Sequence, residues 1–352
     1  MVCVAAFIIL CLISVVVAFL SLFRRDIGRK YWQVFKKAWS CVSKKVRLQK
    51  CETNFKDDVK NTLLRKIVLK RPDLVKPLSV IIEIISVLIV VITIWSLIIA
   101  IKSLFALWVF GTCNVSQPSH CGLGAEACAI DDEDPKNPAE YIGRKVSEWG
   151  EIFNSIPDRL RHWRADDYLP GVTVFAKKVN APLALDIIDP GCSACMQSYK
   201  NQLSSGFFDT NYTALILYPI KLPDGNYKFK NSGLIARYYY ASALFAETHP
   251  KSSQLPQQIL NRLFTGFNAE HINYQALFND YLSSQEAEDL LKLWLRDFKL
   301  SEPDITEITN ISRSDKITKL LAELDDIILN RIHVKGIPTL IYNGRKHYGL
   351  YK

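Results

Sequence analysis

The stretch Leu183–Cys195, LALDIIDPGCSAC, decides the fold predicted for this chain. Its first half, Leu183–Ile188, is an apolar run of strand length, and a Pro-Gly turn follows. Cys192 and Cys195 then stand three positions apart, where a helix over Ala194–Leu203 is predicted to open. Because the N-terminal end of a helix stabilises negative charge, this position favours a thiolate at Cys192. The stretch therefore predicts a redox-active cysteine pair at a strand-to-helix turn.

Such a pair supports thiol–disulfide exchange, in which a thiolate attacks a disulfide and a second thiol resolves the mixed disulfide. Half of a zinc site is the alternative, but that normally needs a second pair of ligands. No other CxxC occurs, and the histidines lack ligand-pair spacing. We therefore predict no metal and no cofactor. A metallochaperone that uses the pair with His333 is kept as a lesser possibility.

Two further features of the sequence, one before and one after the cysteine pair, support this interpretation. Asp186 stands on the apolar strand, six residues before Cys192. Far downstream, Gly336-Ile337-Pro338 begins a second apolar strand, and an X-Pro bond at a fixed turn is the usual place for a cis peptide. A cis Pro338 facing the cysteines would leave the Ile337 backbone free to pair with an extended substrate.

The rest of the chain from about Tyr141 onward alternates between strand and helix patterns. A helix is expected over 141–168, followed by short strands over 172–177, 183–188 and 212–217. The region from Leu234 to about Ile332 is helical in pattern, with helices expected at 234–247, 256–267, 273–282, 284–298 and 314–331. Gly336–Tyr351 reads as a hairpin around Asn343-Gly344. The pattern is α/β with an inserted helical region.

LALDIIDPGCSAC and VKGIPTLIYNGRK together resemble the thioredoxin fold in its DsbA-like branch, over about Val172–Lys352. The helical block between them is similar to the helical insertion of DsbA-like proteins. The resemblance implies that Cys192 is the nucleophile and Cys195 the resolving thiol, joined as a redox-active disulfide. It also implies that Asp186 transfers protons for Cys195, and that Ile337 and Pro338 bind substrate.

The dipeptide between the cysteines is Ser193-Ala194, and no histidine is available there to stabilise the thiolate. We therefore expect the pair to be less oxidising than that of DsbA. A Cys192 pKa of roughly 3–4, as in DsbA, would contradict this expectation.

Cys113, Cys121 and Cys128 form a second group, in a linker rich in Gly, Pro, Ser and Asn. Because the number is odd, one of them is expected to pair elsewhere or to stay free. A structural disulfide that pins the linker is the leading interpretation. A relay that exchanges with Cys192 and Cys195, or metal binding with His120, are the alternatives.

Two apolar segments set the predicted topology. Val2–Phe23 carries no charge and is long enough to cross a bilayer, although a cleaved signal peptide is the rival interpretation. Pro77–Gly111 contains the second span, near Val80–Ile101, with Ser103–Phe110 as an interfacial extension or a tilted end. A buried soluble helix is the alternative for this segment. Because basic loops stay in the cytoplasm, the segment Arg24–Lys76 is expected there.

The chain has 352 residues, 49% of them hydrophobic, and a net charge of +9. The positive charge is concentrated in 24–76, which holds 17 basic and 5 acidic residues, whereas 113–352 holds 26 basic and 29 acidic residues. Attraction of the basic loop to anionic lipid headgroups is therefore favoured over binding to a cytoplasmic partner or to nucleic acid.

The predicted organisation has five parts. They are a transmembrane helix at 1–23, a basic cytoplasmic loop at 24–76, a second transmembrane helix at 77–111, a Cys-containing linker at 112–140, and an exported thioredoxin-like α/β domain at 141–352 with its helical insertion at about 234–332. The location expected from this layout is the inner (plasma) membrane, with the C-terminal domain periplasmic or otherwise extracytoplasmic.

The function expected is a membrane-anchored thiol–disulfide oxidoreductase. It would form, reduce or isomerise disulfides in exported proteins. The partners implied are those substrates, a membrane-embedded or envelope redox partner, and the bilayer. The rival is a non-catalytic thioredoxin-like scaffold subunit of an envelope secretion or conjugation machine.

Overall fold

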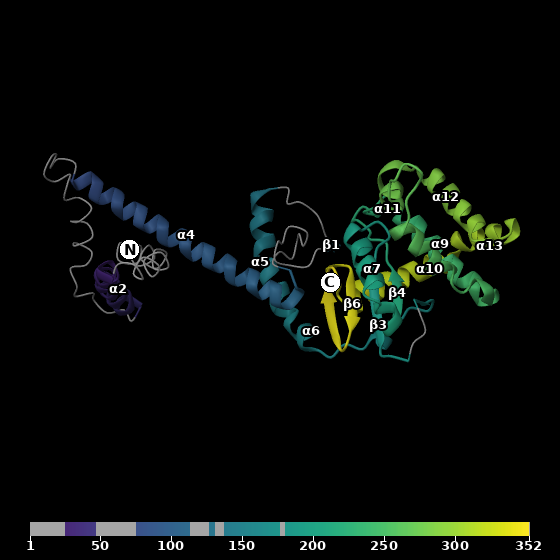
Figure 1. Cartoon of the computed structure of the whole chain (residues 1–352). Coiled ribbons are helices and arrows are strands. Elements are labelled where there is room, and N and C mark those ends of the chain that lie inside the picture. The colour runs from purple at the N-terminus through teal and green to yellow at the C-terminus, as the bar shows by residue number, and fades with distance from the viewer. Residues whose placement is uncertain (1–24, 47–74, 113–126, 131–136, 177–179, 352) are drawn as a thin grey trace. The chain divides into compact units, whose positions relative to one another are not determined.

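The computed structural model describes residues 25–46, 75–112, 127–130, 137–176 and 180–351 (Figure 1). The chain divides into two compact units, Met1–Ile101 and Lys102–Lys352. The predicted span at Val2–Phe23 lies outside the described residues, as do Cys113 and Cys121 and much of the basic loop and the linker.

In the first unit, the described part of the basic loop forms helix α2, Arg25–Val46. It covers the stretch for which headgroup attraction was predicted. Trp32 and Trp39 are exposed on it, and the Lys36 ammonium lies 5.9 Å from the centre of the Trp32 ring. Exposed tryptophan beside lysine is typical of helices that lie at a membrane surface.

Helix α4, Val75–Phe110, runs unbroken through the predicted second span. Among the described residues, its portion Pro77–Phe110 is the one helix long and apolar enough to cross a membrane. Large apolar side chains such as Ile84, Ile92 and Trp95 are exposed along it, unlike those of a buried soluble helix.

The end of α4 differs from the expected interfacial extension over Ser103–Phe110. Ala106, Val109 and Phe110 are buried, and they pack with Ile152 of helix α5 (Pro138–Asn154) in a small apolar cluster. Lys102 on the same helix pairs with Glu148 of α5. The last turns of α4 therefore belong to the core of the second unit.

A mixed five-stranded sheet forms the centre of the second unit, in the order β2-β4-β3-β6-β7. Strand β3 runs parallel to β4 and antiparallel to β6, while β2 and β7 are antiparallel edge strands. The strand bounds are β2 Val174–Phe175, β3 Leu183–Ile188, β4 Tyr212–Leu217, β6 Thr339–Tyr342 and β7 Arg345–Tyr348.

The two central strands are buried over nearly their whole length, which explains their continuous apolar sequences. They run in register from Leu183 opposite Tyr212 to Ile188 opposite Leu217. Parallel neighbours need a crossover, and helices α7 (Ser193–Ser204) and α8 (Phe207–Thr210) supply it. The cysteine pair lies at the start of this crossover.

The C-terminal hairpin is confirmed. Asn343 and Gly344 have φ values of 49° and 73°, as a two-residue turn with positive φ at both positions requires. A Cβ on Gly344 would lie 2.3 Å from His162 Cε1, so glycine is needed for space as well. Strand β2, by contrast, is shorter than the predicted strand at 172–177.

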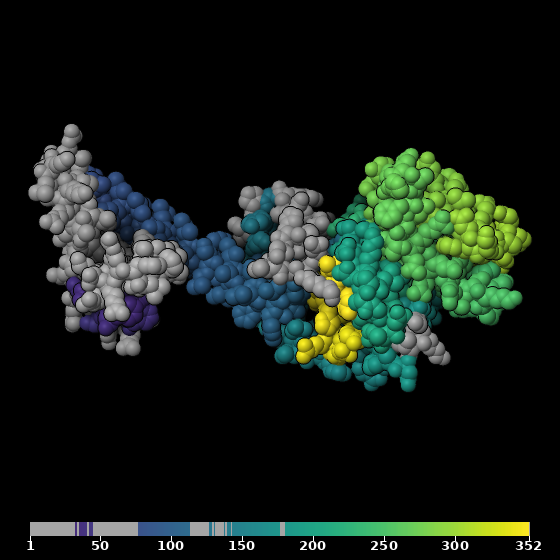
Figure 2. Space-filling model, viewed as in Figure 1, coloured from purple at the N-terminus to yellow at the C-terminus, as the bar shows by residue number. Residues whose placement is uncertain are grey.

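A block of helices lies between β4 and the last strands, as predicted, and it forms a lobe to one side of the sheet (Figure 2). Its elements are α9 Ser232–Thr248, η4 Pro250–Ser252, α10 Leu255–Thr265, α11 Tyr274–Ala276, η5 Leu277–Tyr281, α12 Ser284–Asp297, α13 Glu302–Ser312, α14 Asp315–Asp325 and η6 Asp326–Arg331. Helix α13 is additional to the predicted helices. Tyr238, Tyr239 and Trp294 are fully buried here as core residues.

The single helix predicted over 141–168 is wrong. Helix α5 ends at Asn154, a short helix α6 (Ile156–Leu160) follows, and η3 (Ala165–Tyr168) is a separate turn. Pro157 lies in the first turn of α6, because a proline ring cannot continue the preceding helix. Trp163 and Tyr168, which follow α6, are part of the main hydrophobic core.

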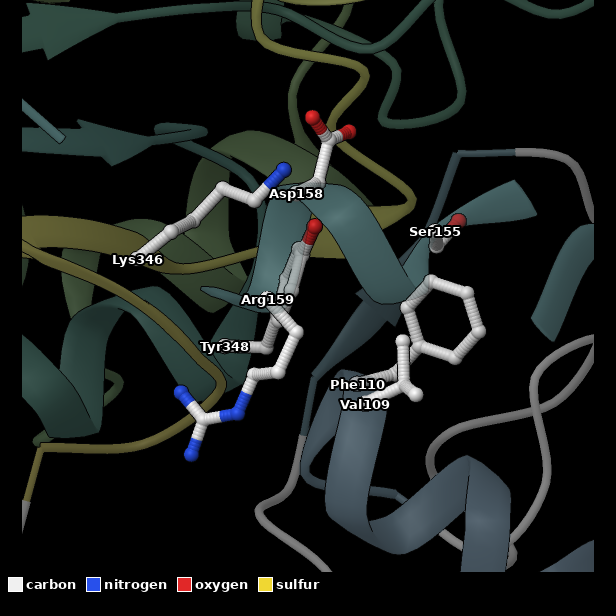
Figure 3. Close-up of a pocket in the computed structure, with 7 residues that line it drawn as sticks. All are labelled: Val109, Phe110, Ser155, Asp158, Arg159, Lys346 and Tyr348. Carbon is white, nitrogen blue, oxygen red and sulfur yellow. The ribbon is translucent and has the colours of Figure 1, made fainter. Parts of the chain in front are cut away.

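Figure 3 shows where the end of α4 meets α6 and the hairpin. The space there, lined by Phe110, Asp158, Arg159, Lys346 and Tyr348, has a volume of about 10 Å³. That volume holds one water at most. The Lys346 ammonium donates a hydrogen bond to the Ile332 carbonyl at 2.8 Å, and burial lowers the pKa of this lysine to about 8. The region where α4, α6 and the hairpin meet is therefore closely packed.

Candidate active site

The turn between β3 and α7 places the cysteines. The Cys192 amide donates to the Asp189 carbonyl at 3.2 Å, which closes the turn through Pro190 and Gly191. A Cβ on Gly191 would lie 2.2 Å from the Phe229 Cβ, so only glycine fits. Cys192 then caps α7, and the Met196 amide donates to its carbonyl at 3.0 Å. The predicted position of Cys192 at a helix N-terminus is confirmed.

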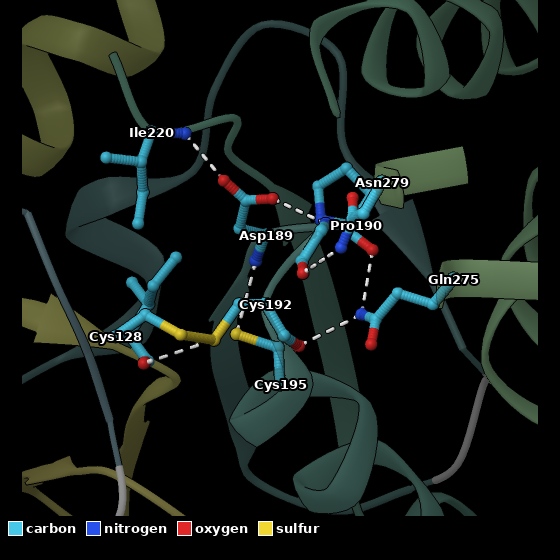
Figure 4. The surroundings of a disulfide bond; sticks show 10 residues. Cys128, Asp189, Pro190, Cys192, Cys195, Ile220, Gln275 and Asn279 are labelled. Atoms are coloured by element: carbon cyan, nitrogen blue, oxygen red, sulfur yellow. Dashed lines mark hydrogen bonds between the residues drawn. A yellow bond between two sulfur atoms is a disulfide. The ribbon is translucent and has the colours of Figure 1, made fainter. Parts of the chain in front are cut away.

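The disulfide differs from the predicted one. Cys192 is bonded to Cys128, 64 residues earlier in the chain, and Cys195 keeps a free thiol (Figure 4). Among the linker cysteines, Cys128 is described and pairs outside the linker, while Cys113 and Cys121 lie outside the described residues. The expected Cys192–Cys195 bond is not the bond formed in this structure, because a third cysteine is brought to the same sulfur by a strand from the linker.

Cys195 lies one turn along α7, on the same side of the helix as Cys192. Figure 4 shows its sulfur pointing toward the disulfide. The Asp189 amide donates a hydrogen bond to this sulfur at 3.3 Å. Burial raises the pKa of the Cys195 thiol well above its ordinary value, and this hydrogen bond offsets the rise only in part. The thiol is therefore protonated at neutral pH.

Asp186 lies on the central strand β3, as predicted, and it is fully buried. Its Oδ2 accepts a hydrogen bond from the Gln202 amide of α7 at 3.0 Å, and its Oδ1 has no partner among the described residues. Burial raises its pKa to about 7, against the smaller opposite effect of Gln202. The charge of Asp186 contributes to the raised pKa of the Cys195 thiol, so the two buried groups interact electrostatically.

Asp189 is a site residue that the sequence analysis missed. Its carboxylate accepts from the Gly191 and Ile220 amides, each at 2.6 Å, so it ties the cysteine turn to the segment after β4. Burial raises its pKa to about 7, although both amide bonds oppose the rise. An acidic residue directly before Pro-Gly was the available signal, because Asp side chains commonly bond the backbone two residues ahead.

The cis-proline loop lies against the cysteines, as predicted. The Ile337–Pro338 bond is cis, and the Cys192 sulfur lies 3.8 Å from the Ile337 carbonyl oxygen. Strand β6 starts directly after Pro338 and pairs with β3, with Thr339 opposite Ile187. The central strand thus carries both halves of the site, although 145 residues separate Cys192 from Ile337.

The helical insertion also contributes to the site, which the sequence did not indicate. The Gln275 side-chain amide donates to the carbonyls of Pro190 at 2.8 Å and Cys192 at 3.0 Å, and that of Asn279 donates to the Gly191 carbonyl at 2.8 Å (Figure 4). These contacts satisfy the carbonyl groups of the turn from the insertion side. They fix the turn that presents the first cysteine.

An open pocket of about 490 Å³ borders the turn on the insertion side. Its lining combines polar and basic side chains with Met196 and Phe229, the others being Gly191, Ser193, Lys228, Lys230, Asn273, Gln275, Ala276, Asn279 and Asp280. In the described part of the chain, no three His, Cys, Asp or Glu side chains gather as a metal site would require. The exposed His333 places its Nδ1 3.1 Å from the Leu329 carbonyl.

These features define a class of site: a cysteine at the head of a helix, a buried acid on the strand before it, and a cis-proline loop opposite, all on a mixed sheet. Together they form a buried cysteine site beside a cis-proline loop, on a mixed α/β sheet with a helical insertion.

Solved structures similar to this chain include the thiol-disulfide exchange protein alpha-DsbA2 from Wolbachia pipientis. The two share 15% sequence identity over 53% of this chain and 84% of that one, with a TM-score of 0.36. DsbA from Pseudomonas aeruginosa is similar over 53% of this chain and 85% of its own, at 15% identity and a TM-score of 0.28. No protein-family model and no curated protein matches the chain.

Proposed function

We propose that this chain is a membrane-anchored thiol–disulfide oxidoreductase that acts on exported proteins. Cys192 is the nucleophile and Cys195 the resolving thiol, while Asp186 exchanges protons with Cys195. Ile337 and Pro338 hold the substrate backbone beside the cysteine. The main support is the 3.8 Å approach of the Cys192 sulfur to the Ile337 carbonyl next to the cis-proline. A chain that pairs with this loop brings its own cysteine to Cys192.

The anchoring part of the proposal rests on α4 and α2. Helix α4 supplies a span, and the basic α2 lies on its cytoplasmic side by the distribution of positive charge. The finer topology proposed has a second span at 1–23, the inner (plasma) membrane as its location and an extracytoplasmic C-terminal domain. A membrane-embedded or envelope redox partner would then renew the cysteine pair.

Cys192→Ser in the full chain tests the catalytic proposal. We expect dithiothreitol-driven reduction of insulin to fall to the uncatalysed rate, because the attacking sulfur is lost. Cys41→Ser, in α2, is the matched control and should leave the rate unchanged. If Cys192→Ser keeps the wild-type rate, the chain is no oxidoreductase at this site.

The burial of the cysteines supports a second candidate function, the non-catalytic scaffold. The Cys192 half of the disulfide has no exposed surface in this structure, as in a purely structural disulfide. A bond that closes a 64-residue separation would stabilise the fold by about 4 kcal/mol through loss of unfolded-state entropy. In that case wild type and Cys192→Ser would show the same absence of exchange, and Cys192→Ser would differ only in a lower Tm.

A further inference from the structure

A short strand from the linker occupies the edge that the proposed substrate would need. Strand β1, Cys128–Ala129, pairs antiparallel with β5, Gly336–Ile337, directly before the cis-proline. Cys128 stands opposite Ile337, and the Ile130 amide continues the pairing with a bond to the Lys335 carbonyl at 3.2 Å. The sulfur of this strand is bonded to Cys192.

Burial differs among the three sulfur-bearing residues. Cys192 and Cys195 are completely buried, whereas Cys128 is partly exposed. No external thiol can reach the Cys192 sulfur while β1 is in place. An incoming thiolate meets Cys128 first, or must wait until the strand leaves.

We propose that Cys128 is a third redox residue of this site, and that its bond to Cys192 is an intramolecular mixed disulfide with β1 in the place of a client strand. This inference rests on the proposed function. In the step that opens the site, the Cys195 thiolate attacks the Cys192 sulfur. The Cys192–Cys195 bond forms, the Cys128–Cys192 bond breaks, and Cys128 leaves as a thiolate.

The step is an isomerisation with no net oxidation. One disulfide and one thiol are present before it and after it. Cys195 gives up a proton and Cys128 takes one up, so no external oxidant or reductant is required. Reversal by the Cys128 thiolate closes the site again. The high pKa that burial imposes on Cys195 keeps its thiolate scarce, which slows the opening step.

Gly336 lets β1 lie this close. A Cβ at this position would be 3.2 Å from the Cys128 carbonyl oxygen and 3.6 Å from the Ala127 Cβ. Both atoms belong to the linker segment, and the first is backbone. Gly336→Ala should therefore weaken β1 pairing while leaving every sulfur in place.

Disulfide mapping of the oxidised full chain in detergent is the first test. After the free thiols are alkylated, mass spectrometry of the wild type should find peptides linked through Cys128 and Cys192. Cys195→Ala should hold essentially all molecules in that form, and Cys128→Ser should move the bond to Cys192–Cys195. A Cys192 bond to Cys113 or Cys121, or to Cys195 alone in the wild type, overturns the assignment.

The rate of exchange with a fluorescent single-cysteine peptide is the second test. If the open form is a minor population, Cys128→Ser should react about tenfold faster or more than wild type. Gly336→Ala should lower the fraction of Cys128–Cys192 bond. Gly143→Ala on α5, where a Cβ would meet nothing within 4 Å, is the matched control.

The outcomes separate this inference from the proposed function. Loss of exchange in Cys192→Ser together with an unchanged rate in Cys128→Ser overturns the role of Cys128 alone. Retained exchange in Cys192→Ser overturns the proposed function and the inference together.

Discussion

Asp186 and Asp189 show how single buried carboxyl groups make the site sensitive to pH. Both have a pKa of about 7, raised from an ordinary value of 3.8 mainly by burial. Below about pH 4 they are protonated in the folded and unfolded chain alike. As pH rises toward 7, the unfolded chain loses these protons first, and the folded state becomes less stable.

Asp186→Asn should remove one of these two pH-dependent contributions. We expect its free energy of unfolding to exceed that of wild type at pH 8 by about 4 kcal/mol, and the difference to shrink toward pH 4. Thermal unfolding of the full chain in detergent across this range measures the effect, with the exposed Asp209→Asn as control. A difference between wild type and Asp186→Asn that does not change with pH would contradict the role of burial.

At the scale of elements, the insertion acts on the site through Gln275. Its side chain is buried, and its amide satisfies the carbonyls of Pro190 and Cys192. Gln275→Ala should therefore destabilise the chain by about 1–3 kcal/mol. It should also slow insulin reduction, because the turn that presents Cys192 loses its support.

Gln285→Ala is the matched control for this prediction. Gln285 lies on α12, where its amide bonds the exposed Asp289 at 3.1 Å. The control should lose less than about 0.5 kcal/mol. Equal effects of the two substitutions on stability and rate would show that Gln275 has no special role at the turn.

The sequence predicted some elements well and others poorly, for identifiable reasons. Strands β3 and β4 have the predicted bounds, because six apolar residues between turn residues fit a buried strand and little else. Asn343-Gly344 fixed the hairpin through local backbone preference alone. The helix predicted over 141–168 rested on apolar periodicity that ends at Phe153. The prediction continued it past Pro157, whereas the structure ends the helix before that proline.

The sequence predicted those parts of the candidate site that short stretches of neighbouring residues specify. Cys192, Asp186 and Pro338 could be named because each lies in a recognisable stretch. The partner of Cys192 could not, since three linker cysteines offered equivalent choices and only the pairing of β1 with β5 distinguishes Cys128. The roles of Gln275 and Asn279 depend on the folding of an insertion whose sequence carries no motif.

At the scale of the whole molecule, the proposed topology predicts where each part of the chain lies. A periplasmically active phosphatase fused after Lys352 should be active in a Gram-negative host, and one fused at Val46 should be inactive, because the basic α2 stays in the cytoplasm. Membranes washed with alkaline carbonate should retain the full chain. An active fusion at Val46 would show that α4 has the opposite orientation to the one proposed.

The tethering of β1 to the domain that it covers has a consequence for client choice. A segment on the same polypeptide competes for β5 at an effective concentration on the order of millimolar. A client that diffuses freely at micromolar levels is outnumbered about a thousandfold by this resident strand. We therefore expect the protein to react with chains that reach it at high local concentration along the same bilayer. Dilute thiols in the surrounding fluid should react little.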